Sequence, residues 1–305
     1  MKTFALLLAL LVEILLLGCG SGGDKRNSRE ERSKSPEPDE PISVDVPEEG
    51  NAFTVPGASL QMLWCPPGAF HMGSPENEKS RDFDEVLREV TLTNGFWLGK
   101  HEVTQGQWEK VMGTNPSHFK GSQLPVEKIS WDEANAFCEK LTEHERTAGR
   151  LHKEQAYQLP TEAQWEYACR AGTRTAWTFG DSPSGLSRYA NFSDKKSNLQ
   201  GADNEYDDGF EFTAPVASYS ANAWGFHEMH GNVFEWCKDW YGKHTSDAVV
   251  NPVGPSIGKE RIFRGGSWAL PSVFTRSARR DKNQSILKSG FLGFRLCLGL
   301  VQDKE

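Results

Sequence analysis

Residues 231–237 read Gly-Asn-Val-Phe-Glu-Trp-Cys, and this run is the strongest indication of the chain's architecture. Arg-Gly-Gly-Ser-Trp follows at residues 264–268, and Gly-Phe-Arg stands near the C-terminus at residues 293–295. In each run an aromatic ring that can fill a core stands near glycine, which allows close approach of the backbone. The chain contains 10 Trp and 29 Gly, and its mean hydropathy is -0.59. These values predict a loop-rich fold with an aromatic core.

Residues 1–18 resemble a secretion signal, with a lysine at the start and a long apolar run after it. Leu-Leu-Gly-Cys at residues 16–19 resembles the lipobox of bacterial lipoproteins, in which Cys19 would be lipidated. The apolar run is interrupted by Glu13. It is too short for the roughly 20 residues that a transmembrane helix needs. We therefore expect an exported protein, lipid-anchored to the bacterial cell envelope on its periplasmic face or at the cell surface.

Residues 19–51 contain few large apolar side chains and many charged residues, serines and prolines. Such a segment buries too little apolar surface to offset the entropy of ordering, so we predict a lipidated, disordered and charged tether. Residues 52–305 then form one domain. The net charge of -8 and the lack of a basic stripe with interleaved aromatic residues argue against a nucleic-acid partner. The oligomeric state does not follow from the sequence.

Three helices are predicted in this domain. Thr104 opens the first, and the pairs Ser130–Glu133 and Thr161–Gln164 form capping boxes for the other two, because each side chain can bond the other residue's backbone N–H. Strands are predicted at residues 70–72, 90–92, 96–98, 262–263 and 294–296. Residues 173–224 are turn-rich. A loop this long is either disordered or held by a metal or ligand.

The three runs described first resemble, in that order, the sulfatase-modifying factor family, whose founding activity is oxidation of a sulfatase cysteine to formylglycine. Further blocks that match the family lie at residues 66–74, 102–104, 125–126, 130–131 and 159–168. Together the blocks extend from about residue 62 to residue 298. The resemblance implies an α+β, C-type-lectin-like fold with little regular secondary structure.

The family carries two calcium sites, and the resemblance suggests ligands for both. The first would use the side chains of Asn191 and Asp208 with the carbonyls of Phe192 and Phe210, and the second the carboxylates of Glu228 and Glu235 with the carbonyls of Gly231 and Val233. Calcium accepts six to eight oxygen ligands in flexible geometry, so these sets suit it. The alternative is that the acidic residues are solvated loop residues. His227 and His230 could bind a transition metal, but the family places them in the calcium loop, where they would pack.

Five cysteines follow the lipobox, and an oxidising compartment permits disulfides. Their odd number leaves at least one thiol unpaired within the monomer. In the animal formylglycine enzyme, the positions of Cys138 and Cys169 are bonded to C-terminal cysteines, and Cys297 lies one residue beyond one such partner. The resemblance therefore suggests a Cys138–Cys297 disulfide. Cys65 and Cys237 are expected to be small buried hydrophobes.

Formylglycine-generating enzymes bind copper(I) through two cysteines that follow the Gly-Gly-Ser-aromatic run. The corresponding residues here are Leu270 and Thr275. Because copper(I) prefers thiolate ligands, which neither residue supplies, a copper cofactor is not expected. Ser267, Trp268 and Phe234 are the candidates to line a cleft that remains on this scaffold.

Three functions are compatible with these observations. The favoured one is a membrane-tethered module without oxidase activity that binds a peptide, protein or glycan in the cleft. The second is an enzyme of other chemistry on the same scaffold, as in periplasmic family members that assist siderophore maturation. The third is a formylglycine-generating oxidoreductase that activates sulfatases through a rearranged cysteine.

Overall fold

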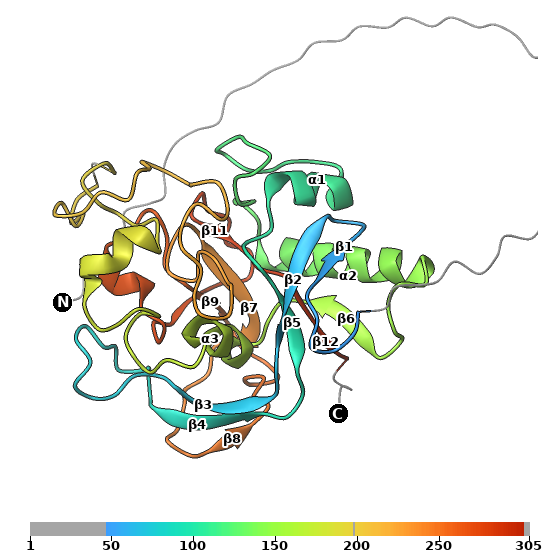
Figure 1. The fold of residues 1–305 in the computed structure, drawn as a ribbon, viewed down its shortest axis with the longest axis horizontal. Helices are drawn as coiled ribbons and strands as arrows, with labels where there is room; N and C mark the ends of the chain where they lie inside the picture. Colours follow the sequence, from blue (N-terminus) through green and yellow to red (C-terminus); the bar gives the residue numbers. More distant parts are fainter. Residues whose placement is uncertain (1–46, 198, 302–305) are drawn as a thin grey trace, which may run out of the picture. The chain divides into compact units, whose positions relative to one another are not determined.

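The computed structural model describes residues 47–197 and 199–301, which belong to one compact unit (Figure 1). The predicted signal peptide, the lipidation at Cys19 and most of the tether lie outside the described residues. Within the described part, the chain forms three sheets and three α-helices joined by long irregular segments. The predicted α+β class with little regular secondary structure is confirmed.

The strands are β1 (Phe53–Val55), β2 (Leu60–Cys65), β3 (Gly68–Met72), β4 (Arg88–Leu92), β5 (Phe96–Gly99), β6 (Gln155–Gln158), β7 (Phe234–Trp240), β8 (Val249–Val250), β9 (Arg261–Arg264), β10 (Asp281–Asn283), β11 (Leu292–Gly293) and β12 (Cys297–Leu300). The α-helices are α1 (Gln105–Met112), α2 (Trp131–Thr147) and α3 (Glu162–Arg170), and two 3-10 helices are η1 (Pro183–Arg188) and η2 (Ser272–Thr275). Within the described part, no helix has the length and apolar character needed to cross a membrane.

The sheets have the strand orders β1-β2-β5-β12-β6, β10-β9-β7-β11 and β3-β4-β8. Helix α2 packs against β6 at one end of the five-stranded sheet, whereas α3 contacts β3, β7 and β9 (Figure 1). Two main hydrophobic clusters result, one containing the apolar side chains of α2 and the other those of α3. Aromatic side chains contribute to both clusters, in line with the composition.

All three predicted helices form, and each begins with a complete capping box. In α2, the Ser130 hydroxyl accepts a hydrogen bond from the Glu133 backbone N–H at 3.2 Å, and the Glu133 carboxylate accepts one from the Ser130 N–H at 2.8 Å. These contacts join residues three apart, so they depend little on the rest of the fold. Helix α1 ends at Gly113 with φ 82°, a left-handed conformation that glycine adopts without steric cost.

The strand predicted at residues 294–296 is wrong, because β11 ends before it and β12 begins after it. The backbone here bonds to the segment that follows β5: the Val103 N–H donates to the Phe294 carbonyl at 3.0 Å. Arg295 is fully buried, and its guanidinium donates to the Gly99 carbonyl at 3.0 Å. The remaining predicted strands correspond to β3, β4, β5 and β9.

The expected Cys138–Cys297 disulfide is absent, since all five described cysteines are free buried thiols. Side chains alternate between the two faces of a strand. In β12, Leu298 therefore packs in the same cluster as Cys138, whereas Cys297 faces the cluster that contains α3. The offset of one residue from the family position turns Cys297 away from α2.

Residues 173–224 are held by packing and hydrogen bonds, both within the segment and to other parts of the chain. Trp177, Leu186 and Phe192 belong to a third, smaller hydrophobic cluster. The buried Asp194 carboxylate accepts hydrogen bonds from the Lys196 N–H at 2.8 Å and from the Asp208 N–H at 2.6 Å. Packing and aspartate-to-backbone hydrogen bonds thus replace regular secondary structure in this segment.

Candidate functional site

Of the two positions that hold the family's reactive cysteines, Leu270 lies two residues before η2 and Thr275 is the last residue of η2. Thr275 is fully buried; its hydroxyl donates to the Ser272 carbonyl at 2.8 Å and accepts from Trp177 Nε1 at 2.9 Å. Gly266 has φ 78°, and a Cβ there would lie 2.7 Å from Thr275 Cγ2, so glycine is needed for this packing. Leu270 is partly buried against the hydrophobic cluster that contains the apolar side chains of α2. The hydroxyl of Thr275 is therefore occupied by structural hydrogen bonds.

Of the three side chains predicted to line a cleft, only Trp268 reaches the surface. Ser267 is 0% exposed and Phe234 is 2% exposed, and the Phe234 ring packs against Phe263 with centroids 4.9 Å apart. Trp268 is partly buried, and its indole N–H donates to the Gly290 carbonyl at 3.0 Å. Ser267 and Phe234 are thus core residues and not cleft residues.

Trp268 is part of an aromatic surface, which we define as Phe119, Phe212 and Trp268. The Phe119 and Phe212 rings stack with centroids 4.8 Å apart, and Trp268 meets them edge-on at 5.6 and 5.3 Å. Phe212 is 41% exposed. The sequence alone does not indicate Phe119 and Phe212, since they come from segments far apart in the chain and share no motif with Trp268.

Buried Glu127 supports the aromatic surface from the backbone of Phe119. Its Oε1 accepts hydrogen bonds from the His118 N–H and from the Phe119 N–H, the latter at 2.8 Å. Its Oε2 is buried without a partner, and burial raises the pKa of this carboxyl. Oε1 therefore orients the loop that presents Phe119.

The first candidate calcium set lies together in the structure. Asn191 is 1% exposed; its Nδ2 donates to the Phe212 carbonyl at 2.7 Å, whereas its Oδ1 is buried without a partner. The Asp208 carboxylate accepts the N–H groups of Phe192 at 2.7 Å and Phe210 at 2.9 Å. Burial raises the pKa of Asp208 to about 6. Asn191 Oδ1 is an orphaned hard oxygen donor, and Asp208 binds the N–H of the next residue, Phe192, so the set fits a hard cation.

The second candidate set has its side-chain oxygens occupied by protein donors. Glu235 accepts two hydrogen bonds from Arg295, at 2.7 and 2.9 Å, and one from Trp165 Nε1 at 2.7 Å. Glu228 accepts the N–H groups of Ala217 at 2.9 Å and Tyr219 at 3.3 Å. These side chains have no orphaned oxygen, so they fit a cation less well than the first set.

Gly231 and Val233 are the residues whose backbone carbonyls belong to the second set, and Gly231 packs against Asn191 of the first set. Gly231 has φ 125°, and a Cβ there would lie 2.2 Å from the Asn191 carbonyl oxygen. Val233 is fully buried, and its N–H donates to Glu102, which lies in a block that matches the family but was not a predicted site residue. Burial, followed by the negative charges of Glu228 and Glu235, raises the pKa of Glu102. Across the described residues, no three His, Cys, Asp or Glu side chains converge in a way that would hold a metal.

His227 and His230, which the sequence offers as possible transition-metal ligands, lie within hydrogen-bonding distance of backbone atoms. His230 Nδ1 lies 2.9 Å from the Thr275 carbonyl oxygen, and Nε2 accepts the Thr178 N–H at 3.1 Å. Burial lowers the pKa of His230 to about 4, so its ring is neutral near pH 7. His227 Nδ1 lies 2.8 Å from the Tyr219 carbonyl oxygen. His230 therefore has no free nitrogen for a transition metal.

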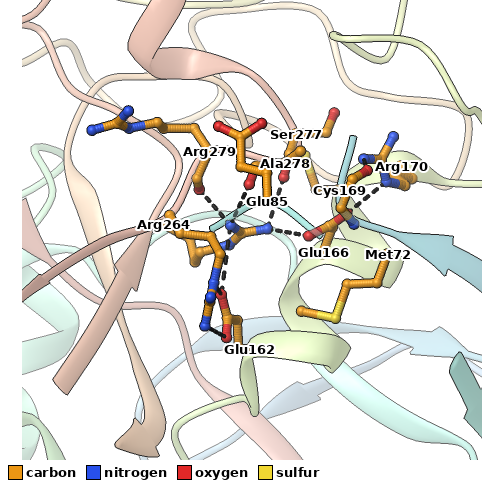
Figure 2. Close-up of polar contacts among 12 residues, drawn as sticks. Met72, Glu85, Glu162, Glu166, Cys169, Arg170, Arg264, Ser277, Ala278 and Arg279 are labelled. Carbon is orange, nitrogen blue, oxygen red and sulfur yellow. Dashed lines mark hydrogen bonds and ion pairs between the residues drawn. The ribbon is translucent and has the colours of Figure 1, made fainter. Parts of the chain in front are cut away.

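A buried ionic network fixes the segment that follows η2 (Figure 2). The Glu166 carboxylate accepts hydrogen bonds from Arg264, from Arg170 at 2.8 Å and from the Gly73 N–H at 2.8 Å. Arg264 also donates to the Ala278 carbonyl at 2.9 Å. This network connects α3 with β9, with the end of β3 and with residues 277–279. Because η2 ends two residues before residue 277, the network also restrains the position of η2.

Residues 50–299 of the chain match the family model described as "Sulfatase-modifying factor enzyme 1-like domain". The formylglycine-generating enzyme of Mus musculus is 29% identical, and the matched region covers 79% of this chain and 75% of the relative. Treponema denticola variable protein 1 is 27% identical with a TM-score of 0.67, covering 81% of this chain and 98% of the other. PvdO from Pseudomonas aeruginosa is 26% identical with a TM-score of 0.68, and the match covers 84% of this chain and 100% of PvdO. The chain therefore belongs to the sulfatase-modifying factor enzyme 1-like family.

Proposed function

We propose that this protein is a membrane-tethered binding module without oxidase activity, and that it binds a peptide or glycan at the aromatic surface. The observation that carries the proposal is the contrast between two neighbouring features. The Thr275 hydroxyl is buried and hydrogen-bonded, and Leu270 has no ligand atom, whereas Trp268 and Phe212 remain accessible. The accessible aromatic rings support a recognition role, and the reactive positions lack thiols.

The aromatic surface has the chemistry of a recognition site. Aromatic rings offer large, rigid contact areas, and exposed indole and phenyl faces pack well against apolar side chains and sugar rings. Binding energy in such sites concentrates in a few aromatic anchors. The Glu127 hydrogen bonds and the Asn191 bond to the Phe212 carbonyl hold two of the three ring-bearing segments in place before a ligand arrives. This rigidity reduces the entropic cost of binding.

Binding is tested with a phage-displayed peptide library and a glycan array. We expect Trp268→Ala and Phe212→Ala each to weaken binding of the enriched ligands by at least about tenfold, in the range of interface anchors. Phe83→Ala is the matched control, because Phe83 is 77% exposed and lies outside the aromatic surface. Equal binding by all variants, or no enrichment over a blank surface, would contradict the proposal.

The lack of oxidase activity is tested with copper and a peptide that carries the sulfatase motif Cys-x-Pro-x-Arg. We expect no formylglycine above background by mass spectrometry, because copper(I) needs soft thiolate ligands and Leu270 and Thr275 provide none. The other cysteines are buried, and burial raises the pKa of Cys169 to about 12 and also that of Cys297 to about 12. Multiple-turnover conversion of the peptide would establish the oxidase alternative instead.

We also propose that calcium binds the first candidate set, Asn191 and Asp208 with the carbonyls of Phe192 and Phe210. The orphaned Asn191 Oδ1 supports this site. No backbone N–H among the described residues donates to the carbonyl oxygen of Phe192 or of Phe210. Calcium would supply positive charge that neutralises Asp208 and cross-links residues 191–210. Its role would be structural, since the site anchors the segment that carries Phe212.

Calcium removal should therefore lower the melting temperature. A ligand that binds only the native state at a hundredfold excess over Kd stabilises it by about 2.7 kcal/mol, which corresponds to roughly 5–10 °C for a domain of this size. We expect chelation to shift the wild type and the control Asp207→Asn by this amount, and Asp208→Asn far less. Asp207 is the exposed neighbour, paired with Lys195 at 3.1 Å. A melting curve unaffected by chelator and added calcium would return these residues to the solvated-loop alternative.

The lipobox-like residues 16–19 support a tether to the cell envelope. If Cys19 is lipidated, the mature protein partitions into detergent, and Cys19→Ala abolishes this partitioning, since the acyl chains provide the membrane affinity. Phase separation in Triton X-114 measures it. Cys138→Ala is the control, because Cys138 is a buried thiol. Unchanged partitioning of Cys19→Ala would refute the lipoprotein assignment.

A further inference from the structure

A cavity of about 430 Å³ lies between the β3–β4 hairpin, the start of α3, the end of β7 and residues 252–255. It shares no residue with the aromatic surface or with either candidate calcium set. Its lining residues include Arg88, Glu162, Asp239, Trp240, Lys243, His244 and Arg280. Its volume falls within the roughly 300–1,000 Å³ typical of small-molecule sites.

Most charges in this cavity are already paired. Arg280 donates to both oxygens of Glu162, at 2.6 and 2.9 Å, and to the Gly242 carbonyl at 3.1 Å. His244 Nε2 lies 3.4 Å from the same Glu162 carboxylate, which also faces Arg264 at 3.6 Å. Glu162 and Arg280 therefore have their charges paired within the protein, and they form one wall of the cavity. Figure 2 shows Glu162 beside Arg264.

Arg88 is only partly buried, and it differs from the buried arginines Arg264, Arg280 and Arg295. Among the described residues it forms no ion pair, its Nε is buried without a partner, and its Nη2 contacts only Met72 Sδ, at 3.6 Å. Burial lowers the pKa of its guanidinium, which indicates incomplete compensation of its charge. Neither Nη group donates to an oxygen of the described residues, so these two groups can pair with an oxyanion in the cavity. Lys243 adds an exposed cation at the same cavity.

The remaining lining residues define the size and charge of a suitable ligand. Trp240, Pro252, Val253 and Pro255 provide an apolar wall for an organic group. Asp239 is buried, and its Oδ2 accepts the Glu162 N–H at 2.9 Å. Burial, followed by the charge of Glu162, raises the pKa of Asp239 to about 7, so this carboxyl repels an anion only in part near neutral pH. Because the carboxyl groups of Glu162 and Asp239 line the cavity and repel negative charge, a monoanion fits better than a phosphate dianion.

We propose that this cavity binds a small organic carboxylate, whose oxygens pair with the Arg88 guanidinium and whose body packs against Trp240 and the prolines. A carboxylate matches the planar, forked donors of arginine and can accept two parallel hydrogen bonds. The site is separate from the aromatic surface, so the protein has two independent binding regions.

The test uses the full-length protein in detergent and isothermal titration calorimetry with three probes. N-acetylglycine carries the carboxylate, N-acetylglycinamide is its neutral isostere, and inorganic phosphate is the alternative oxyanion. We expect N-acetylglycine to bind at least about tenfold more tightly than the amide, in line with charge-assisted pairing. We expect Arg88→Gln to remove this preference.

Arg174→Gln is the matched control, since Arg174 is an exposed arginine outside the cavity. It should leave binding unchanged, and so should Trp268→Ala, which separates this site from the proposed recognition surface. Lys243→Gln, at an exposed position, should weaken N-acetylglycine binding even if Arg88→Gln fails to fold. No heat of binding for N-acetylglycine, equal affinity for the amide, or binding of phosphate alone would each overturn the proposal.

Discussion

Glu166→Gln is expected to lower the free energy of unfolding by about 3–5 kcal/mol, the cost of breaking a buried ion pair from one side. The Glu166 carboxylate is 1% exposed and accepts hydrogen bonds from Arg264 and Arg170, both buried (Figure 2). The glutamine keeps the shape but removes the negative charge. Arg264 would then rely on Glu162, which lies 3.6 Å away.

Urea unfolding followed by tryptophan fluorescence measures this loss. Glu143→Gln provides the control, because Glu143 is an exposed residue of α2 and such substitutions change stability by about 0.5 kcal/mol or less. A loss below about 1 kcal/mol for Glu166→Gln would show that the network is not a major source of stability.

Asp239→Asn should stabilise the protein at alkaline pH. Burial, followed by the charge of Glu162, raises the pKa of Asp239 to about 7, whereas an unfolded aspartate titrates near 3.9. Between these values the folded state binds more protons than the unfolded state, so stability falls as the pH rises from about 4 to about 7. A pKa difference of about three units between the folded and unfolded states lowers the free energy of unfolding by at most about 4 kcal/mol.

Asparagine mimics the protonated carboxyl and can still accept the Glu162 N–H. The variant should therefore exceed the wild type by about 2–4 kcal/mol at pH 8 and match it near pH 4. Guanidinium unfolding at both pH values measures the difference, with the exposed Asp247→Asn as control. A stability difference that does not change with pH would show that Asp239 ionises normally in the folded protein.

The local features of the fold followed from the sequence. The helix starts at Thr104, Ser130 and Thr161 were predicted because a capping box joins residues three apart. The family and the α+β class followed from several short blocks in the right order. The candidate site followed only in part: Trp268 was identified, whereas Phe119 and Phe212 were not.

Tertiary structure decided the features that depend on contacts between distant segments. Cys138 and Cys297 do not pair, because the alternation of β12 turns the cysteine to the opposite face from Leu298. Among the described residues Arg88 has no ion pair, whereas Glu162 pairs with Arg280, which lies 118 residues further along the chain than Glu162. Capping and motif order are encoded within a few residues and can be read directly. The face of a side chain and the partner of a charge depend on packing across the whole domain.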